Sequence, residues 1–584
     1  MKKTLLAVLV ISLFVGCTKR HELGNVLRVA IREKYKSLDP AFAQDYYSGI
    51  EVKRVYEGLY QYHYLKRPYE LITELAEALP EIDKTGTIYT IRLKKNVRFQ
   101  DDSCFPSGKG RQFVAEDVVY SFKRLADPKL APSGWWILDD RVKGLNEWRE
   151  KNTKGLFTDY DLPVVGLKAV DAHTLRIELT KPCPFFPQLL AMPYASIVPR
   201  EAVEKYRNDF ANHPVGTGAF FLKFLSKNQL IWDKNPTFHG ESYPTDGEPE
   251  DKKNGLLADA GKPLPFVDRI IDDIIIEDQP AWLNFMQGNH DYLMTLPKDN
   301  EGSVFNSDKK PKKELLDKKI SVSVTPALEF GYIVFNNEIP IFSGEKGRQL
   351  RKAISLAYDE SPLISTFYFG LATKAQSPVP PGVWGYDPAY KNPNRIYNLV
   401  KAREILEKIG HPGGAGLPEI EYDTNSQPNQ RLLAEYFQKS MALLGLKVKV
   451  QIWSWPEFLA RIRKRQSQVV FINWLLDYPD AENVYQLMYS KNASPGTNYA
   501  NYKNPKFDKI YEEFSQIQNG PKRKELLIKM RKIYEEDLPF FATLHRPETR
   551  VYHDWTKNLK IHSFEHSIEK YLRIDIEART KAQQ

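Results

Sequence analysis

A short apolar segment at the start of the chain decides where the rest of it must fold. Lys2 and Lys3 precede an apolar run from Leu5 to Gly16, and Cys17 follows directly. A basic start, a short apolar core and a small residue before the cut are typical of a secretion signal. The run is shorter than the roughly 20 residues of a membrane-spanning helix, and no later run reaches that length. We therefore expect the remaining chain to fold as soluble domains outside the cytoplasm.

The end of this segment, residues 14–17 (Phe-Val-Gly-Cys), resembles the lipobox of bacterial lipoproteins. The resemblance implies removal of residues 1–16, attachment of lipid to the Cys17 thiol, and a short tether over residues 17–21. Each buried CH₂ contributes about 0.8 kcal/mol, so two or more acyl chains would hold the protein firmly on a membrane. The expected location is extracytoplasmic and membrane-anchored, in the periplasm or at the cell surface. The alternative is a plain secreted protein in which Cys17 has no special role.

Length and composition predict two or three globular domains. A chain of 584 residues is too long for one core. A hydrophobic content of 42% and a charged content of 27% are ordinary for globular proteins and exclude wholesale disorder. The net charge is +9, and +7 without Lys2 and Lys3. The basic residues are scattered, and the densest cluster, residues 461–465, is expected to be a solvated face. We expect no nucleic-acid partner.

Two further cysteines could form a disulfide. If Cys17 carries lipid, Cys104 and Cys183 remain, an even number in a compartment that permits disulfides. Both lie among turn residues. We predict a bridge between them, and the alternative is a pair of separate buried thiols.

Four short segments have the periodicity of regular secondary structure. Their apolar residues predict strands at residues 25–31, 89–93 and 175–179, and a helix over residues 115–125. Strands and helices mix irregularly along the whole chain. This mixture favours an α/β or α+β protein over a repeat array or a barrel.

One further helix has a recognisable start signal. Ser48 precedes Glu51 by three residues, which is the spacing of a capping box. The helix that follows would carry Val52, Val55 and Leu59 on one face. The pattern therefore predicts a helix that begins at Ser48.

Seven short segments follow one another at characteristic intervals: residues 37–40 (SLDP), 57–59 (EGL), 89–99 (YTIRLKKNVRF), 115–124 (AEDVVYSFKR), 215–220 (VGTGAF), 287–291 (QGNHD) and 350–354 (LRKAI). In this order they resemble the peptide-type (family 5) solute-binding proteins of ABC importers, which are extracytoplasmic oligopeptide and dipeptide receptors. The resemblance covers about Leu27 to Leu572. Each segment is weak evidence by itself, and the shared order and spacing make the set specific.

The resemblance implies an α/β fold of the type II, cluster C-like periplasmic-binding-protein class, with two lobes, a hinge and an extra α+β domain. Lobe I would comprise residues 22–56, 194–328 and 548–584. The extra domain would be residues 57–193, and lobe II residues 329–547, so the chain would cross between the lobes near Ala327 and Pro547. Such lobes close on ligand by a hinge motion. Ligand drives closure through its better contacts in the closed state.

The segment at residues 473–480 (NWLLDYPD) resembles the Trp-x-x-Asp sequence of the peptide receptors. The resemblance places Trp474, Leu475 and Asp477 at the ligand, with Asp477 as the anchor of the free amino terminus of a peptide. A buried ammonium needs a buried carboxylate, because either group alone has a large desolvation cost. The alternative is that Asp477 caps a loop and Trp474 belongs to the core.

Other parts of the ligand site are implied by the same resemblance. The backbone just before Asp477, and that of Gln44, Asp45 and Tyr46 from lobe I, would pair with the ligand as an added strand. Trp455 stands where the family has an aromatic pocket wall, and the alternative is that it packs in the core. Because main-chain pairing does not read side chains, the implied selectivity is broad.

The sequence departs from the family where oligopeptide receptors hold the ligand's carboxylate. Ile339 and Phe471 stand at the matching positions, and no His lies near Pro428. Arg461 and Arg463 lie close to one such place but out of register. The ligand could therefore be a peptide of another length, a cell-wall peptide or a non-peptide cargo.

One catalytic pattern occurs in the chain. Residues 562–566 (HSFEH) match the His-x-x-Glu-His string of one class of zinc peptidases. That chemistry needs both His on one helical face and a further carboxylate, for which Glu569 or Glu577 could be proposed. The string lies beside a strand-like segment, which favours a chance match. The sequence has no Gly-x-Ser-x-Gly elbow, no phosphate-binding glycine loop and no Cys-x-x-Cys pair. We expect no enzymatic activity, no cofactor and no metal site.

Four functions remain to be compared. The leading hypothesis is a monomeric, lipid-anchored receptor that captures short peptides and delivers them to an ABC permease. The second keeps the fold but changes the cargo to an opine, a sugar or a metal chelate. The third is a zinc-dependent surface hydrolase, and the fourth is a sensor or chaperone-like binder without a transporter.

Overall fold

The predicted strand near the start of the chain lies inside a seven-stranded sheet. The computed structural model describes residues 25–297 and 300–584, so the predicted signal and Cys17 lie outside the described residues. β1 (Val26–Ile31) is buried along nearly all of its length, which explains its continuous apolar sequence. The strand order is β12-β19-β11-β1-β10-β9-β8, formed with β8 (Phe220–Leu225), β9 (Gln229–Lys234), β10 (Arg269–Ile274), β11 (Tyr292–Leu293), β12 (Ile320–Pro326) and β19 (Pro547–His553).

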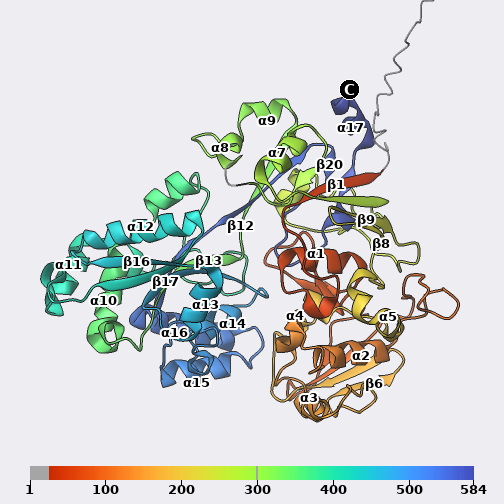
Figure 1. Cartoon of the computed structure of the whole chain (residues 1–584), viewed down its shortest axis with the longest axis horizontal. Helices are drawn as coiled ribbons and strands as arrows, with labels where there is room; N and C mark the ends of the chain where they lie inside the picture. Colours follow the sequence, from red (N-terminus) through yellow and green to blue (C-terminus); the bar gives the residue numbers. More distant parts are fainter. Residues whose placement is uncertain (1–24, 298–299) are drawn as a thin grey trace, which may run out of the picture.

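Helices of the same part of the chain lie around this sheet (Figure 1). They are α1 (Tyr46–Val55), α5 (Arg200–Tyr206), α7 (Asp278–Met286), α8 (Glu301–Val304), α9 (Lys313–Asp317) and α17 (Ile576–Gln583). In the part of the chain that the structure describes, no helix combines the length and apolarity that crossing a membrane requires.

A six-stranded sheet forms from a later part of the chain. Its central strand β13 is buried at all seven positions and pairs antiparallel with strands on both sides. The order is β14-β18-β13-β17-β15-β16, formed by β13 (Glu329–Phe335), β14 (Thr373–Lys374), β15 (Ile420–Asn425), β16 (Val448–Trp453), β17 (Val469–Leu475) and β18 (Phe540–His545). Its helices include α10 (Gly344–Ala357), α11 (Leu399–Lys408), α12 (Pro428–Ala442), α13 (Trp455–Arg463), α14 (Glu482–Tyr485), α15 (Pro505–Phe514) and α16 (Pro521–Asp537).

A smaller, four-stranded sheet contains the other two predicted strands. Its order is β4-β5-β7-β6, formed by β4 (Glu81–Ile82), β5 (Ile88–Arg92), β6 (Leu167–Asp171) and β7 (Thr174–Glu178). The predicted helix is confirmed as α2 (Ala115–Leu125), and it is joined here by α3 (Leu145–Lys154) and the short α4 (Phe186–Leu189). Tyr89 and Ile91 of β5 are fully buried, as their alternation predicts.

Two neighbouring strands connect the two large sheets (Figure 1). β12 continues into β13 through Ala327, and β18 continues into β19 through Arg546. β12 and β19 pair antiparallel over seven residues, and the Ala327 N–H donates to the Arg546 carbonyl at 2.8 Å. We call the seven-stranded part lobe I, the six-stranded part lobe II and the four-stranded part the extra domain. The residue bounds that the sequence predicts for these three parts remain a proposal. The separation of the three sheets described above supports that proposal.

The start of α1 differs from the prediction. Asp45, rather than Ser48, caps the helix: its carboxylate accepts the Ser48 N–H at 2.9 Å and the Ser48 hydroxyl at 2.7 Å. The helix therefore begins at Tyr46 and ends at Val55, so Leu59 lies beyond it. Two residues with good N-cap propensity lie three positions apart, and the earlier one caps the helix.

A buried charge cluster ties α1 to distant parts of lobe I. The Arg54 guanidinium binds Glu51 at 2.8 Å, Glu569 at 3.0 Å, and Asp272. Each of these four side chains is at most 1% exposed. The Tyr292 hydroxyl also donates to Glu569, at 2.9 Å. Buried charges persist where they are paired and hydrogen-bonded, so loss of Arg54 would leave three buried carboxylates without their cation.

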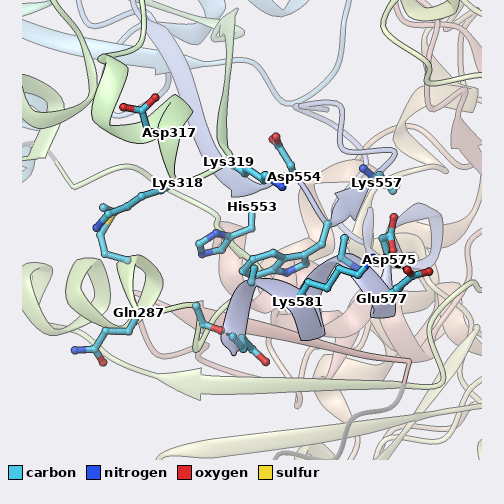
Figure 2. A pocket seen from close by; sticks show the side chains of 16 residues that line it. Gln287, Asp317, Lys318, Lys319, His553, Asp554, Lys557, Asp575, Glu577 and Lys581 are labelled. Carbon is cyan, nitrogen blue, oxygen red and sulfur yellow. Dashed lines mark hydrogen bonds and ion pairs between the residues drawn. The ribbon is translucent and has the colours of Figure 1, made fainter.

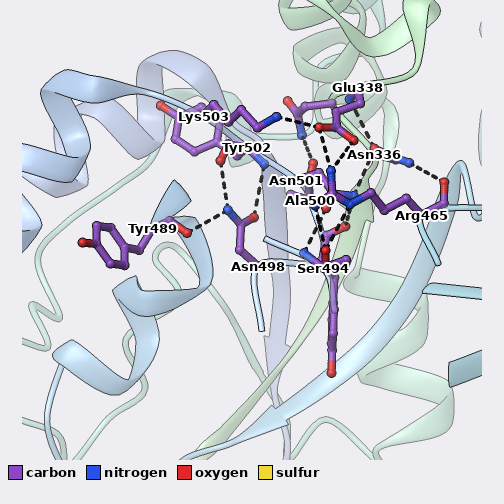
Figure 3. A network of polar contacts seen from close by, with 12 residues as sticks. Asn336, Glu338, Arg465, Tyr489, Ser494, Asn498, Ala500, Asn501, Tyr502 and Lys503 are labelled. Carbon is purple, nitrogen blue, oxygen red and sulfur yellow. Dashed lines mark hydrogen bonds and ion pairs between the residues drawn. The ribbon is translucent and has the colours of Figure 1, made fainter. Parts of the chain in front are cut away.

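A polar network holds the segment before α15 against the end of β13 (Figure 3). Glu338 accepts from Arg465 at 3.1 Å and from Lys503 at 2.8 Å. Asn501 donates to Asn336 at 3.2 Å. These contacts are internal to lobe II and fix a loop that has few regular hydrogen bonds of its own.

The predicted disulfide is wrong, because Cys104 and Cys183 are both free. Cys104 is partly exposed beside Asp102, and Cys183 is buried beside Arg141. Burial raises the pKa of each thiol to about 12, so both are unreactive at neutral pH. The even number of cysteines did not define a pair, since the two thiols lie in different surroundings.

Candidate ligand-binding site

The candidate site begins where β17 leaves the six-stranded sheet. Leu475, the last residue of the strand, is 60% exposed. The next residue, Leu476, is buried, and its N–H donates to the Leu328 carbonyl at 3.0 Å. The chain then turns through Asp477 toward α14. The end of β17 therefore presents one exposed apolar side chain and one carboxylate beside the strand that leads in from lobe I.

Asn483 of α14 fixes the position of Asp477. The Asn483 side-chain N–H₂ donates to Asp477 Oδ2 at 3.0 Å. Its carbonyl oxygen accepts the Asp477 backbone N–H at 3.2 Å and the Trp474 indole N–H at 3.0 Å. One buried amide thus joins two of the residues that the sequence placed at the ligand.

The Asp477 carboxylate has no cation beside it among the described residues. Burial raises its pKa above the usual aspartate range, and the hydrogen bond from Asn483 opposes that rise only in part. Asp480, three residues later, binds the Arg523 guanidinium with both oxygens, at 2.7 and 2.8 Å. Asp477 therefore carries a desolvation cost, although it is only partly buried, without the compensation that its neighbour has.

Tyr194 brings the two lobes together at this point. It belongs to the short helical turn Pro193–Ala195. Burial raises the pKa of Tyr194 to about 12, and the nearby carboxylates of Asp477 and Asp45 add to the rise. Tyr194 therefore lies near both the end of β17 in lobe II and the start of α1 in lobe I.

The two lobe I residues singled out in the sequence already have structural partners. The Asp45 carboxylate caps α1, so only its backbone is available to a ligand. The Tyr46 hydroxyl accepts from the Arg550 guanidinium at 2.8 Å. Burial raises the pKa of Tyr46 to about 12, which keeps the hydroxyl neutral.

Trp455 stands apart from the Asp477 cluster. It is the first residue of α13, it is 48% exposed, and its ring contacts Phe458 at 5.7 Å between centroids. A half-exposed tryptophan is not a core residue, which removes the alternative raised from the sequence. Contact with a ligand stays a prediction.

The positions expected to lack basic residues are apolar in the structure as well. Phe471 is buried in β17, where its ring fills the space beside Gly331, and Ile339 is partly buried against the core. Arg461 is not available as a substitute: it binds Asp423 at 2.9 Å and lies over the Trp453 ring at 4.3 Å. The site therefore has an acidic end without the family's basic end.

The zinc alternative is wrong on geometry. Residues 562–566 form a turn and not a helix, and His562 Nδ1 already accepts the backbone N–H of Glu565 at 2.7 Å. Glu569 is held by the arginine of the buried cluster, and Glu577 binds a lysine at 2.6 Å. Over residues 25–297 and 300–584, no group of three or more His, Cys, Asp or Glu is placed to hold a metal ion.

A hollow of about 800 Å³ also opens at the outer end of lobe I (Figure 2). Its lining carries equal numbers of lysines and carboxylates, and several are already engaged. Lys581 binds Glu577 at 2.6 Å, Asp575 caps α17, and Asp554 accepts from Ser321. These charged side chains serve the fold, and the hollow is lined by lobe I alone.

Sequence reasoning missed Asn483 and Tyr194. Asn483 lies six residues after Asp477, without a spacing that would single it out. Tyr194 comes from a segment far from both aspartates in the sequence. Only the tertiary structure brings these residues together, so no local signal could have identified them.

Comparison with known proteins places this geometry in a family. Residues 70–496 match the model of the bacterial extracellular solute-binding proteins, family 5. The chain is 24% identical to di/tripeptide-binding protein 1 of Pseudomonas aeruginosa, over 83% of each chain. It is 25% identical to heme-binding protein A of Haemophilus influenzae, over 91% of this chain and 87% of the relative. The solved structure of HbpA2 from Haemophilus parasuis has the same fold, with a TM-score of 0.76 and 23% identity, covering 94% of this chain and all of that one (100%).

Proposed function

We propose, because this chain belongs to the bacterial extracellular solute-binding proteins of family 5, that it captures short peptides between its lobes and delivers them to an ABC importer. The relative from Pseudomonas aeruginosa that is named for di- and tripeptide binding supports peptides as the cargo. The role requires binding and release and no covalent chemistry. The observation that carries the proposal is the partly buried Asp477 carboxylate, which has no cation beside it among the described residues.

The amino terminus of a peptide matches this carboxylate in charge and size. An ammonium that approaches Asp477 would restore the pairing that Asp480 has with Arg523. Asn483 holds the carboxylate in place, so little conformational freedom would be lost on binding. Binding of a cation would also lower the Asp477 pKa toward its usual range. The change in pKa and the stabilisation by the ion pair are two measures of the same interaction free energy.

The surroundings of Asp477 favour a ligand recognised mainly through its backbone. Leu475 lies two residues before Asp477 and is 60% exposed, and Trp455, which stands apart from Asp477 at the start of α13, is 48% exposed. The backbone before Asp477 and that of Gln44 to Tyr46 would pair with an extended peptide, while these apolar surfaces cover varied side chains. This combination gives affinity with broad selectivity.

A second candidate cargo follows from the apolar residues at the positions where oligopeptide receptors hold the ligand's carboxylate. Ile339 and Phe471 offer no charge to a carboxylate. A non-peptide ligand with a cationic group and an apolar body would satisfy both ends. The relative named for heme binding shows that family members of similar sequence differ in cargo.

We propose further that the mature protein acts as a monomer that a lipid on Cys17 holds near its permease. The support is the sequence of residues 14–17. A receptor confined to a membrane surface meets its permease by diffusion in two dimensions. Mass measurement of the mature chain, with a shift equal to the acyl groups on Cys17, tests the anchor separately from the cargo.

Mass spectrometry of the small molecules released by denaturing the purified protein tests the cargo. A set of short peptides with free amino termini is the expected result. A single non-peptide compound would overturn the peptide proposal and favour the second candidate. As a control, the same extraction from the Asp477→Asn variant should release far less peptide, while the surface variant Asp308→Asn should match the unaltered protein.

A further inference from the structure

The extra domain touches lobe II directly beside the candidate anchor. Phe185, which precedes α4 of the extra domain, stacks on Tyr478 of lobe II with centroids 5.1 Å apart and ring planes 5° apart. The two residues are 6% and 2% exposed. Tyr478 is the residue after Asp477. A contact between two separate sheets is thus buried next to the carboxylate proposed to hold the ligand.

A buried acid extends this contact into lobe II. Glu482 is 5% exposed, and its carboxylate accepts the hydroxyls of Tyr478 and Tyr511. Burial raises the pKa of Glu482, and the Arg141 guanidinium of the extra domain partly offsets the rise. Arg141 and Glu482 line the same pocket between the extra domain and lobe II, so the guanidinium adds electrostatic attraction to the aromatic stack.

One turn of helix connects this interface to the ligand anchor. Glu482 and Asn483 are consecutive residues of α14. Glu482 holds the Tyr478 ring that stacks on the extra domain, whereas Asn483 holds Asp477 and Trp474. Displacement of α14 would disturb both contacts together, because a single helical turn cannot move one residue without the next.

We propose that the extra domain helps to retain the ligand, with Phe185 and Arg141 as positioning residues that hold α14, and through it Asp477, in the binding geometry. We call this arrangement the clamp. The inference rests on the proposed function, in that Asp477 receives the cationic group of the ligand. It goes beyond closure of the two lobes, because it makes retention of ligand depend on a third part of the chain.

The same interface contains a natural reporter of its state. Cys183, two residues before Phe185, is 6% exposed and lies beside Arg141. It lines a pocket of about 570 Å³ between the extra domain and lobe II, together with Phe185, Tyr478 and Glu482. Separation of the two parts would expose its thiol, so the rate of thiol modification measures how often the interface opens.

The decisive experiment combines this thiol with peptide binding. In the full mature chain, Cys17→Ser and Cys104→Ser leave Cys183 as the remaining thiol, since the chain has three cysteines. Trialanine is the probe, measured by calorimetry and by its protection of Cys183 from a charged maleimide. Phe185→Ala is expected to weaken trialanine binding about tenfold, mainly through faster release, and to remove most of the protection of Cys183.

Three companion variants separate positioning from folding. Phe185→Tyr retains the stacked ring and should restore both affinity and protection. Arg141→Met weakens the same interface at a second residue and should speed modification of Cys183. Phe157→Ala removes a phenylalanine of the same domain that is 85% exposed, and it should change neither measurement. Circular dichroism spectra matching the unaltered chain establish that each variant is folded.

The outcomes distinguish the two proposals. Unchanged trialanine affinity and unchanged Cys183 protection in Phe185→Ala would overturn the clamp and leave the proposed function standing. If trialanine fails to bind the unaltered chain, the peptide proposal fails. The clamp is then tested by the rate at which Cys183 is modified in the absence of ligand. Modification of Cys183 at least threefold faster in Phe185→Ala then supports the clamp, and an unchanged rate overturns it.

Discussion

Two groups of carboxylates in this molecule differ in their partners. Under α1, Glu51, Asp272 and Glu569 surround Arg54, and every side chain is at most 1% exposed. At the end of β17, the partly buried Asp477 carboxylate is hydrogen-bonded to an amide, without a cation beside it among the described residues. In the first arrangement the cation is part of the protein itself. The second leaves a charge to be matched, which is the property expected of a site that binds a cation.

The largest effect should come from breaking the paired region. Arg54→Met leaves three buried carboxylates without their cation, and removal of one partner from a buried ion pair costs about 3–5 kcal/mol. We expect a loss of unfolding free energy of this order in urea, or failure to accumulate as folded protein. Arg92→Met is the matched control, because its ion pair with Glu81 is 63% and 67% exposed and should contribute less than about 1 kcal/mol. Equal losses in the two variants would contradict the role given to the cluster.

The next effect concerns binding at the unpaired region. Asp477→Asn should weaken the binding of trialanine about 100-fold, since truncating one partner of a buried charge pair costs about 2–5 kcal/mol. Nα-acetylated trialanine lacks the ammonium, and its weak binding should not change with the variant. Calorimetry with both peptides measures the difference. Equal losses for the two peptides would show that Asp477 does not read the amino terminus.

Asn483→Leu should have a smaller effect on the same measurement. The leucine keeps the volume but removes the hydrogen bonds that hold Asp477 and Trp474, so we expect trialanine binding to weaken about tenfold. The double variant Asp477→Asn, Asn483→Leu should bind no more weakly than Asp477→Asn alone, because Asn483 acts through Asp477. Additive losses would indicate that Asn483 contacts the ligand independently.

The smallest effect is on the stability of the empty protein. The folded-state pKa of Asp477 is raised, so its ionised form destabilises the fold at pH values above that pKa, and the cost disappears below the unfolded pKa of about 4. Asp477→Asn should therefore slightly raise the unfolding free energy at pH 7 and leave it unchanged at pH 3. Asp480→Asn should do the opposite at pH 7, because it removes the partner of Arg523. Destabilisation by Asp477→Asn at pH 7 would contradict the view that the ionised Asp477 carboxylate lacks a compensating partner.

The sequence predicted those features that depend on local patterns or on a family-wide order of segments. The strand at residues 25–31 and the helix at 115–125 follow from their apolar periodicity, and the structure confirms both. The Trp-x-x-Asp spacing singled out Asp477, which is partly buried without a cation beside it among the described residues, unlike its neighbour Asp480. The mixed α/β fold and the family followed from the order of segments, and the comparisons confirm them.

The remaining features depend on contacts that the sequence does not encode locally. Arg54 meets Asp272 and Glu569, which are 218 and 515 residues away along the chain. Cys104 and Cys183 were paired by count, although each lies among different neighbours. Asn483 became important only because α14 folds back on the turn after β17. In each case the tertiary structure, and not the local sequence, selects the partner.

The position of β19 has a consequence for how this protein is made. β19 lies between β12 and β11 in the seven-stranded sheet, yet it comes from residues 547–553. Until those residues have been synthesised, the sheet is two fragments with unpaired edges, and such edges are sites of aggregation. Lobe I therefore cannot mature domain by domain as the chain emerges. A nascent chain that stalls before its last 40 or so residues would present these open edges to chaperones and proteases.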